Sequence, residues 1–434
     1  FFQAQDGIRD RSPSRGLGDV YKRQLLRDGL SSVGRPTRIL QNVSPKKKYE
    51  VVVIGGGAHG LACAHYLARN YDITNVAVLD SGWIGGGNTA RNTSIVRSDY
   101  LLDSSFKLKN FSLQLWKTLS QELNYNVMYS PRGYIDLAHS DGELESFSCR
   151  ANAMCLGGAN AQILTPKEIE YLEPSINLHA KTRFPISGAL YQPDGGLVRH
   201  DAVAWGFARS ASNLGVDIVQ NCHVSGFGIQ DNCVTSVETD LGRIFTDKVL
   251  ISAAGQSAKL AQRAGFELPV EMINVQAFVS EPVKPVLKRV VNYNAGLSYV
   301  SQTDKGEFVM GGASDGYPSF ARRGGFARIE DTVVRTMEIF PFVSKLRLMR
   351  HWSGTADIPM DGNGIVGQTP IKNLYINCGW GYAGFKATPA VGWTIAELIA
   401  TDHLPELLKP FSLDRFERGA LIDDAGVGPY PWLH

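Results

Sequence analysis

The sequence lacks the features that mark membrane, nucleic-acid-binding and disulfide-built proteins. No apolar run in its 434 residues approaches the roughly 18–20 residues that span a bilayer. The 44 basic and 42 acidic side chains leave a net charge of +2, which favours neither nucleic acid nor an acidic membrane surface as a partner. The six cysteines include no CxxC pair, which indicates buried thiols rather than disulfides or a metal site. We expect a cytoplasmic protein without a bound metal.

The first residues lack any hydrophobic period. Residues 1–24 are rich in Arg, Asp, Ser and Gly and resemble the translation of a sequencing-library adapter, so we expect this segment to be non-native. The alternative is a targeting peptide, but mitochondrial presequences are poor in acidic residues, and Asp6, Asp10 and Asp19 lie here. Residues 25–48 are interpreted as a polar N-terminal extension.

The remaining sequence has ordinary globular composition and two kinds of strand pattern. Apolar runs typical of buried parallel strands lie at 49–54, 76–79, 216–219, 248–255 and 374–379. Antiparallel strands are expected at 127–138, 223–246 and 270–312, and helices at 61–68, 104–123, 141–158, 201–214, 257–264, 328–339 and 388–400. This order predicts a mixed α/β (α+β) fold in which a Rossmann-like nucleotide-binding domain, 49–126, 197–268 and 345–434, is interleaved with an antiparallel-sheet substrate domain, 127–196 and 269–344.

A glycine pattern follows the first strand and opens the first helix. In Gly55-x-Gly57-x-x-Gly60, the first glycine permits a tight turn, the second lets the backbone approach a pyrophosphate, and the third allows close helix–strand packing. Asp80 ends the second strand, where a carboxylate can accept a hydrogen bond from a ribose hydroxyl. A glycine-rich turn without ligand is the alternative. The contacts expected of a dinucleotide here are Gly55, Gly57, Ala58, His59, Gly60 and Asp80.

Three further segments favour FAD over NAD as the dinucleotide. A glycine-rich polar loop at 82–98 follows the second strand, and the strand at 248–255 ends in small residues. A glycine-rich turn at 379–386 precedes another helix, and His351 and Asp357 lie near it, with a structural role at least as plausible for both. A flavin dinucleotide lies extended and is wrapped on several sides, so it can use all three. The candidate contacts are Asn88, Thr89, Arg91, Asn92, Ile95, Val224, Ala254, Gly255, Gly379, Gly381, Gly384 and Lys386.

A family resemblance covers residue 45 to the C-terminus. The chain resembles the D-amino-acid-oxidase/glycine-oxidase superfamily of FAD-dependent amine oxidases, and within it most closely the beta subunits of heterotetrameric sarcosine oxidases. The glycine motif is shared by many families. The narrower matches are ARNTSIVRS, VRHDAVAWGFA, WSGTADIPMDGNGIVG and NCGWGYAGFKATPAVGW.

The resemblance implies an enzyme with two flavins and several partner subunits. FAD would be held noncovalently, and FMN would be attached covalently to His200 at a subunit interface. Sarcosine would be demethylated to glycine, electrons would pass from FAD to FMN, and O2 would be reduced to H2O2. The alpha, gamma and delta subunits would be partners, with tetrahydrofolate and NAD bound on a partner subunit. From the residues alone, His200 reads only as a histidine at the start of a helix.

Arg97 and Lys386 are the candidate catalytic residues. A guanidinium and an ammonium together hold an amino-acid carboxylate well, and the resemblance places Arg97 and Lys386 at such a site. Two surface cations are the alternative. Two other functions stay open: a stand-alone dimethylglycine or D-amino-acid dehydrogenase, and a flavin-binding electron-relay subunit without turnover of its own.

Overall fold

A computed structural model describes residue 40 and residues 43–179, 182–183, 185–293, 298–422 and 424. Asn42–His434 forms one compact unit. The segment 1–24 and residues 25–39, 41 and 42 of the extension lie outside the described residues, so their expected origin stays a prediction.

The first of two large sheets has a parallel centre. Its order is β17-β18-β11-β1-β2-β8, with β10 paired to β11 and β9 paired to β10. The five strands from β18 to β8 run parallel, and the pairings of β17 with β18, β10 with β11 and β9 with β10 are antiparallel. The bounds are β1 Lys48–Ile54, β2 Val76–Asp80, β8 Asp217–Gln220, β9 Val224–Gln230, β10 Cys233–Thr239, β11 Gly242–Ile251, β17 Ile365–Gln368 and β18 Leu374–Cys378.

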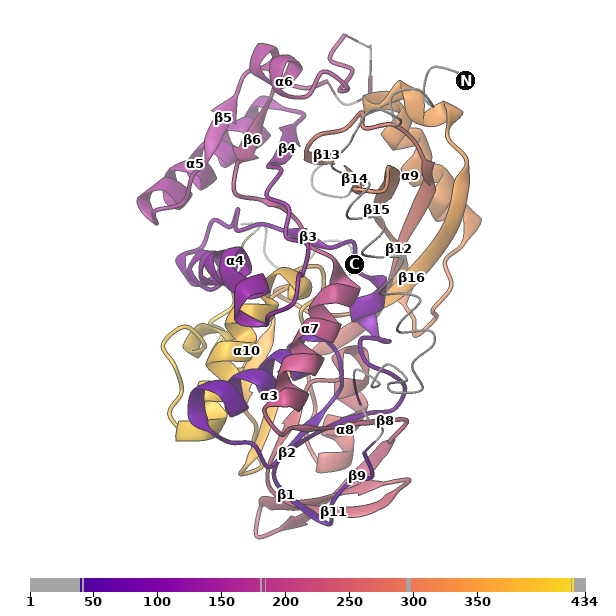
Figure 1. The fold of residues 1–434 in the computed structure, drawn as a ribbon. Coiled ribbons are helices and arrows are strands. Elements are labelled where there is room, and N and C mark those ends of the chain that lie inside the picture. The colour runs from indigo at the N-terminus through magenta and orange to yellow at the C-terminus, as the bar shows by residue number, and fades with distance from the viewer. Residues whose placement is uncertain are drawn as a thin grey trace, which may run out of the picture. The chain divides into compact units, whose positions relative to one another are not determined.

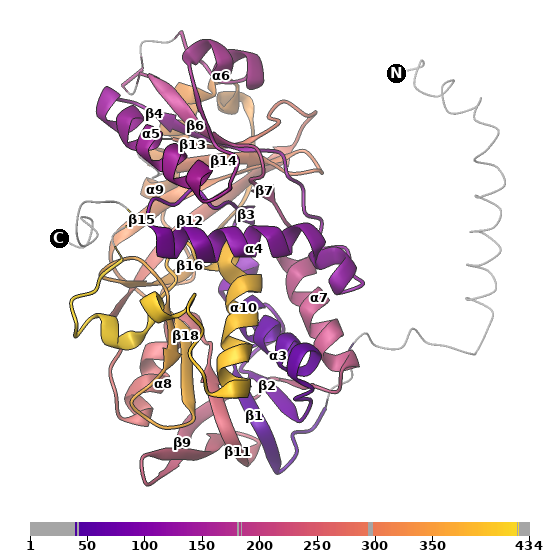
Figure 2. The same ribbon diagram turned by 90° about the vertical axis from the view of Figure 1, so that its left-hand side faces the viewer.

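Helices cover this sheet and pack against one another. Helices α3 (Ala58–Tyr71), α7 (His200–Asn213) and α10 (Gly384–Thr401) lie side by side, as Figures 1 and 2 show. A side chain at Gly392 of α10 would place its Cβ 2.5 Å from Cβ of Ala62, so glycine lets α10 close on α3. Helix α8 (Ser257–Ala264) packs on β9 and joins an apolar core with the strands.

The second sheet is almost entirely antiparallel and is drawn in the upper half of Figure 1. Its order is β16-β12-β15-β14-β13-β4-β6-β5, and only β13 and β4 pair in parallel. Helix α9 (Phe326–Ile339) and the short helix η3 (Pro341–Lys345) contribute to its core, and α5 (Asp141–Leu156) and α6 (Pro166–Leu172) pack near β5 and β6. The strands are β4 Tyr134–Ala138, β5 Gln162–Leu164, β6 Gly188–Gln192, β12 Val270–Pro282, β13 Val290–Tyr293, β14 Ser298–Gln302, β15 Glu307–Pro318 and β16 Leu348–Pro359.

Two elements connect the sheets. The strands β3 (Ile95–Val96) and β7 (Gly196–Leu197) form a two-stranded ribbon. The long helix α4 (Asp103–Glu122) crosses the end of α10 in Figure 2. Ser112 Oγ and Trp116 Nε1 of α4 donate to the carbonyl of Lys386 at 2.6 and 3.0 Å, so α4 fixes the first turn of α10.

The predicted fold class is confirmed, with local corrections. Strand β16 pairs with β12 along its whole length in the second sheet, although its residues were assigned to the nucleotide-binding stretch 345–434. Helix α10 begins at Gly384 rather than 388, with Pro389 inside it. The loop 82–98 contains the short helix η1 (Asn88–Arg91), and only 134–138 of the strands expected at 127–138 form. The domain boundaries themselves stay a prediction.

The cysteine prediction holds in part. All six cysteines are free thiols, but only Cys63, Cys222 and Cys378 are buried, whereas Cys149 and Cys155 on α5 are exposed. None of the described helices is long and apolar enough to cross a bilayer.

Candidate active site

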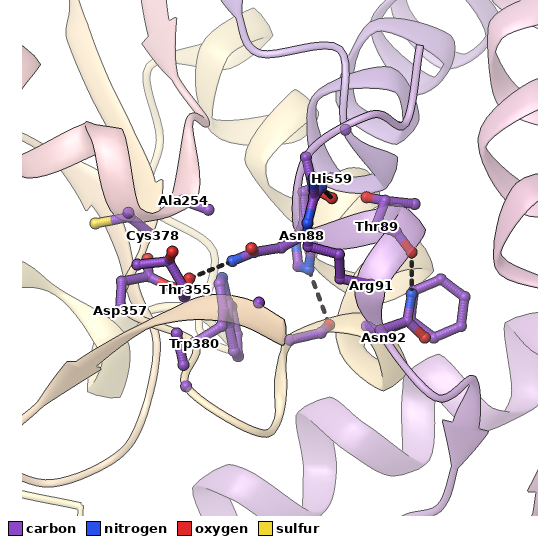
Figure 3. A pocket seen from close by; sticks show the side chains of 18 of the residues that line it. His59, Asn88, Thr89, Arg91, Asn92, Ala254, Thr355, Asp357, Cys378 and Trp380 are labelled. Atoms are coloured by element: carbon purple, nitrogen blue, oxygen red, sulfur yellow. Dashed lines mark hydrogen bonds between the residues drawn. The ribbon is translucent and has the colours of Figure 1, made fainter. Parts of the chain in front are cut away.

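A cavity of about 1400 Å³ is lined by residues from both large sheets. Ligand pockets commonly measure about 300–1,000 Å³, so this cavity has room for a large cofactor and a small substrate together. Its wall includes the turn after β1, the segment around η1, the end of β11, part of β16 and the start of α10. Figure 3 shows how these segments, distant in the sequence, face one space.

The glycine turn has the geometry that its sequence predicted. Gly55 has a φ of +115°, and a Cβ there would lie 2.2 Å from the carbonyl oxygen of Ser252. A Cβ at Gly60 would lie 2.1 Å from the carbonyl oxygen of Gly55, so helix and strand pack too closely for a side chain. Helix α3 follows Gly57, which has no side chain to cap it, and its first turn holds no acidic residue. Such a helix start offers backbone N–H groups and a positive dipole end to a phosphate.

Asp80 is tied into the same turn. Its Oδ2 accepts a hydrogen bond from the backbone N–H of Gly56 and its Oδ1 one from that of Gly82, both at 2.7 Å. The carboxylate still lines the cavity. Asp80 therefore orients the turn, and each oxygen keeps a lone pair that a ribose hydroxyl can use.

The segment around η1 is anchored to two different parts of the structure. The hydroxyl of Thr89 accepts from the backbone N–H of Ala58 at 3.0 Å, and Asn88 Nδ2 donates to the carbonyl of Thr355 on β16 at 2.6 Å (Figure 3). Arg91 donates to the carbonyls of Gly86 and Gly87 at 2.5 and 2.6 Å. The segment thus joins the glycine turn to the second sheet along the cavity wall.

A neutral histidine on α3, His59, contacts the start of α10 and the end of β18. His59 Nε2 lies 2.9 Å from the carbonyl of Gly384, and its Nδ1 lies 3.2 Å from Asn377 Nδ2. Burial lowers the pKa of His59 to about 4, so the ring is uncharged near neutral pH and the carbonyl accepts from its Nε2–H. His59 stacks on Trp380, with ring centroids 5.5 Å apart.

Asp357 on β16 supports the same turn. Its Oδ2 accepts from the backbone N–H of Gly379 at 2.6 Å, and its carbonyl accepts from that of Gly381 at 2.9 Å. Burial raises the pKa of the Asp357 carboxyl to about 6. The turn therefore rests on a buried acid from the other sheet, and Asp357 also lines the cavity.

Arg97 and Lys386 meet around the ring of Tyr100. The ring centroid lies 5.4 Å from Arg97 Cζ and 5.8 Å from Lys386 Nζ, and Lys386 Nζ donates to the Tyr100 hydroxyl at 3.3 Å. Arg97 also pairs with the buried carboxylate of Asp99. Burial lowers the pKa of Lys386 well below its ordinary value, and the positive charge of Arg97 adds a smaller effect in the same direction. We call Arg97, Tyr100 and Lys386, which line the cavity, together with Asp99, the cation end.

His200 stands beside the cavity. Its Nδ1 lies 3.1 Å from the hydroxyl of Ser94, which lines the cavity, but His200 itself is not among the lining residues. Burial lowers the pKa of His200, so its imidazole is neutral near pH 7. The described residues include no hydrogen-bond partner for Nε2, so that nitrogen has its lone pair available when Nδ1 carries the proton.

Most of the predicted site residues gather at the cavity. Those that line it are Gly55, Gly57, Ala58, His59, Asp80, Asn88, Thr89, Arg91, Asn92, Ile95, Arg97, Val224, Ala254, Gly255, Gly381, Gly384 and Lys386. Gly60, Gly379 and His200 do not. Gly60 and Gly379 instead allow the backbone to pack closely. A Cβ on Gly379, whose φ is +70°, would lie 3.1 Å from Ile365.

Sequence reasoning missed several residues of the wall, among them Tyr100, Tyr134, Thr355 and Trp380. Tyr100 follows Arg97 by three residues, and Trp380 lies inside the glycine turn, so proximity to the motifs was an available signal. Tyr134 and Thr355 come from the second sheet. Their approach depends on strand pairing that no local pattern reveals.

The chain fits FAD by its own features. A helix start without an acidic residue and a close-packed glycine turn suit a pyrophosphate, and the cavity exceeds the size of a single small ligand. Gly57, where a Cβ would meet only the Thr89 hydroxyl at 3.3 Å, leaves the backbone approachable.

Comparisons with known proteins agree with this geometry. The family described as FAD dependent oxidoreductase matches residues 50–398. Sarcosine oxidase subunit beta of an Arthrobacter species is 48% identical over 392 residues, 90% of this chain and 97% of that protein. The protein of the same name from Rhizobium meliloti (strain 1021) is 47% identical over 410 residues, 94% of this chain and 98% of that one.

A solved structure gives the same fold. L-proline dehydrogenase from P. horikoshii superposes with a TM-score of 0.81 at 27% identity, covering 87% of this chain and all of that one. The predicted relationship to sarcosine oxidase beta subunits is therefore confirmed, and with it a flavin enzyme. The chain belongs to the FAD dependent oxidoreductase family.

Proposed function

We propose that this chain is the sarcosine-oxidising subunit of a multi-subunit sarcosine oxidase. One observation carries the proposal: Arg97 and Lys386 converge on Tyr100 at one end of a cavity suited to FAD. A guanidinium and an ammonium in a partly dry site bind a small carboxylate strongly. The name of the relatives, sarcosine oxidase subunit beta, supports sarcosine as the substrate. Sarcosine is a small amino acid with one carboxylate, which suits these two cations.

The residues of the cation end would orient the substrate. Arg97 and Lys386 hold its carboxylate, and Asp99 fixes the guanidinium through their ion pair. FAD, when bound, supplies the acceptor for a hydride from the N-methyl carbon of sarcosine. Because the amine must be neutral for this transfer, a site rich in positive charge favours loss of the amine proton. No general base is required by this scheme.

We assign the covalent FMN of the proposed enzyme to His200. A neutral imidazole with a free Nε2 is a competent nucleophile, and the hydrogen bond between Ser94 and Nδ1 would fix the ring and its tautomer. Ser94 also connects His200 to the segment around η1, because its backbone N–H donates to Asn92 Oδ1 at 2.6 Å. The covalent link would therefore form next to the FAD-facing wall.

The remaining steps would involve partners. Alpha, gamma and delta subunits would complete a heterotetramer, with tetrahydrofolate and NAD on a partner chain. Tetrahydrofolate would take the one-carbon unit as methylenetetrahydrofolate, and electrons would pass from FAD to FMN and then to O2, giving H2O2. The cytoplasm is the expected location. The relatives' name, subunit beta, supports a multi-subunit enzyme.

Anaerobic reduction tests the catalytic part of the proposal. We expect sarcosine, added without O2 to the complex co-expressed with its partner subunits, to bleach the visible flavin band. A band that persists under excess sarcosine would contradict the proposed oxidase function and favour an electron-relay subunit. Bleaching by dimethylglycine or by a D-amino acid, but not by sarcosine, would instead indicate a stand-alone dehydrogenase of another amine.

The mass of the peptide that contains His200 tests the FMN assignment. We expect this peptide from the denatured complex to carry the added mass of FMN. An unmodified peptide, together with flavin that is fully released on denaturation, would leave an enzyme with noncovalent FAD alone.

A further inference from the structure

Helix α4 buries a lysine that the proposed mechanism does not use. Lys109 is 1% exposed, and its Nζ has no hydrogen-bond partner among the described residues. The ammonium lies against three rings, with centroids at 4.8 Å for Tyr100, 5.1 Å for Trp380 and 5.7 Å for Phe411. Cation–π contacts stabilise such a charge but do not neutralise it.

Lys109 adds a third cation around Tyr100. The same ring lies within 6 Å of Arg97 and Lys386, as described for the cation end. Tyr100 and Trp380 line the cavity, whereas Lys109 is not among the lining residues. Lys109 therefore stands against the far side of two residues that form the cavity wall.

The nearby acids compensate the cluster only in part, and one oxygen of the buried Asp99 carboxylate, Oδ2, has no hydrogen-bond partner among the described residues. Asp99 pairs with Arg97, and Asp424 accepts from the backbone N–H of Leu102 at 3.3 Å and from Asn363 Nδ2 at 3.1 Å. Within the described part of the chain, neither Lys109 nor Lys386 has an ion pair with a carboxylate. Three buried cations against two nearby carboxylates leave positive charge in excess, and burying it costs stability, so this cluster suits an anion that the described part of the chain does not supply.

We propose that Lys109 is a third cation of the substrate site, which acts through space to raise the affinity of Arg97 and Lys386 for a carboxylate. The inference rests on the proposed function, since it deepens the carboxylate site assigned there. Lys109 is a positioning residue, because the aromatic wall separates it from the cavity. Its effect is electrostatic and should depend on the charge of the ligand rather than on its shape.

The charge of Lys109 should disappear in an accessible pH range. Burial lowers the pKa of Lys109 to about 8, with Asp424 raising it and Arg97 lowering it. Among the described residues, Tyr100, Lys386 on α10 and the neutral His59 on α3 are the other titratable groups close to Lys109. Since protonated Lys109 attracts an anion, carboxylate affinity should fall as the pH rises from 7 to 9.

Two isosteric ligands test the proposal in the assembled, FAD-loaded complex. Methoxyacetate copies the shape of sarcosine and carries a carboxylate, and 2-methoxyacetamide replaces that carboxylate by a neutral amide. The dissociation constant of each is read from the change in the flavin absorbance spectrum. For Lys109→Met we expect methoxyacetate to bind roughly tenfold more weakly and 2-methoxyacetamide to be unchanged. The pH dependence between 7 and 9 should flatten in this variant.

The matched control lies on the same helix. Lys107, two residues earlier, is exposed and pairs with Asp103, so Lys107→Met should leave both dissociation constants unchanged. Lys109→Arg, which keeps the charge, should retain most of the methoxyacetate affinity. FAD content and thermal unfolding of each variant report whether its fold is intact.

The outcomes separate this inference from the proposed function. Methoxyacetate affinity within twofold of wild type in a folded Lys109→Met complex overturns the inference, and so does an equal loss for both ligands, which would indicate damaged packing. Should Lys109→Met not fold, a wild-type affinity for methoxyacetate that stays constant from pH 7 to 9 overturns it. If the wild-type complex binds no methoxyacetate and is not bleached by sarcosine, the proposed carboxylate site itself fails.

Discussion

The two ends of the cavity are built in different ways. At the nucleotide end, the short turn Gly55–Gly60 makes the site with its backbone, and the carboxylate of Asp80, at the end of β2, holds that turn in place. At the cation end, Arg97 and Lys386 come from segments far apart in the sequence and meet only around Tyr100. The first end depends on the absence of side chains, and the second depends on their charge.

This difference predicts different responses to mutation. Changes at the nucleotide end should act on the fold and on FAD content together, because the same backbone contacts serve both. Changes at the cation end should spare FAD and alter the affinity for substrate. Substitutions at the two ends should therefore have separable effects on FAD content and substrate affinity.

Gly55→Ala should be the most damaging single change. Its Cβ would lie 2.2 Å from the carbonyl oxygen of Ser252, and its φ of +115° is unfavourable for any residue with a side chain. We expect a loss of more than about 3 kcal/mol in the free energy of unfolding, and no FAD retained. Chemical unfolding and the absorbance of purified protein measure both.

Gly57→Ala is the matched control for that variant. Its Cβ would meet only the Thr89 hydroxyl, at 3.3 Å, so the apoprotein should unfold within about 1 kcal/mol of wild type while FAD binds more weakly. Equal losses of unfolding free energy in the two variants would contradict the expectation that the close contacts of an added Cβ make Gly55 the more sensitive position.

Lys386→Ala should separate substrate binding from cofactor binding. Removing an ammonium that contacts a carboxylate should lower kcat/KM for sarcosine by about a hundredfold, from the roughly 1.5–3 kcal/mol of a charge-assisted hydrogen bond. FAD content should stay near wild type. Loss of FAD instead would move Lys386 from the cation end to the cofactor site and break the comparison.

The same contrast explains what the sequence could predict. Gly55–Gly60 and the apolar runs of β1, β2 and β18 carry local signals, and the strands formed where those signals placed them. Strand β16 was not predicted as a strand, because its place depends on pairing with β12, a long-range contact that no local pattern reveals. The start of α10 was set too late because Pro389 marks a typical first turn, whereas contacts from α4 hold the helix from Gly384.

Lys109 shows a signal that was present but unused. Ser105, Lys109, Ser112 and Trp116 follow one another at helical spacing, and all four are buried. A lysine on the buried stripe of a predicted helix is unusual, because lysine is rarely buried without a partner. Its neighbours Trp380 and Phe411 could not be inferred, because both come from the C-terminal part of the chain.

Asp357→Asn should stabilise the apoprotein at pH 8 and not at pH 4. The folded pKa of Asp357 is raised from 3.8 to about 6 by burial, so folding disfavours the ionised form. This cost is absent below pH 3.8, grows up to about pH 6 and is complete above it. A shift of this size corresponds to about 3 kcal/mol at most, and a weaker bond to the Gly379 N–H should reduce the gain to about 2 kcal/mol. Unfolding curves at both pH values measure it.

Asn88→Ala should have the smallest effect and should probe the connection between the two ends. The Asn88 side chain donates to the carbonyl of Thr355 at 2.6 Å and thereby ties η1 to β16 of the second sheet. Loss of one such bond costs about 1 kcal/mol of unfolding free energy, because the half-buried carbonyl can be reached by water. If η1 belongs to the nucleotide end, FAD should bind more weakly while methoxyacetate affinity of the FAD-loaded complex stays constant. An equal weakening of FAD and methoxyacetate binding would show that η1 couples the two ends. The nucleotide end and the cation end would then not respond independently to a change in this helix.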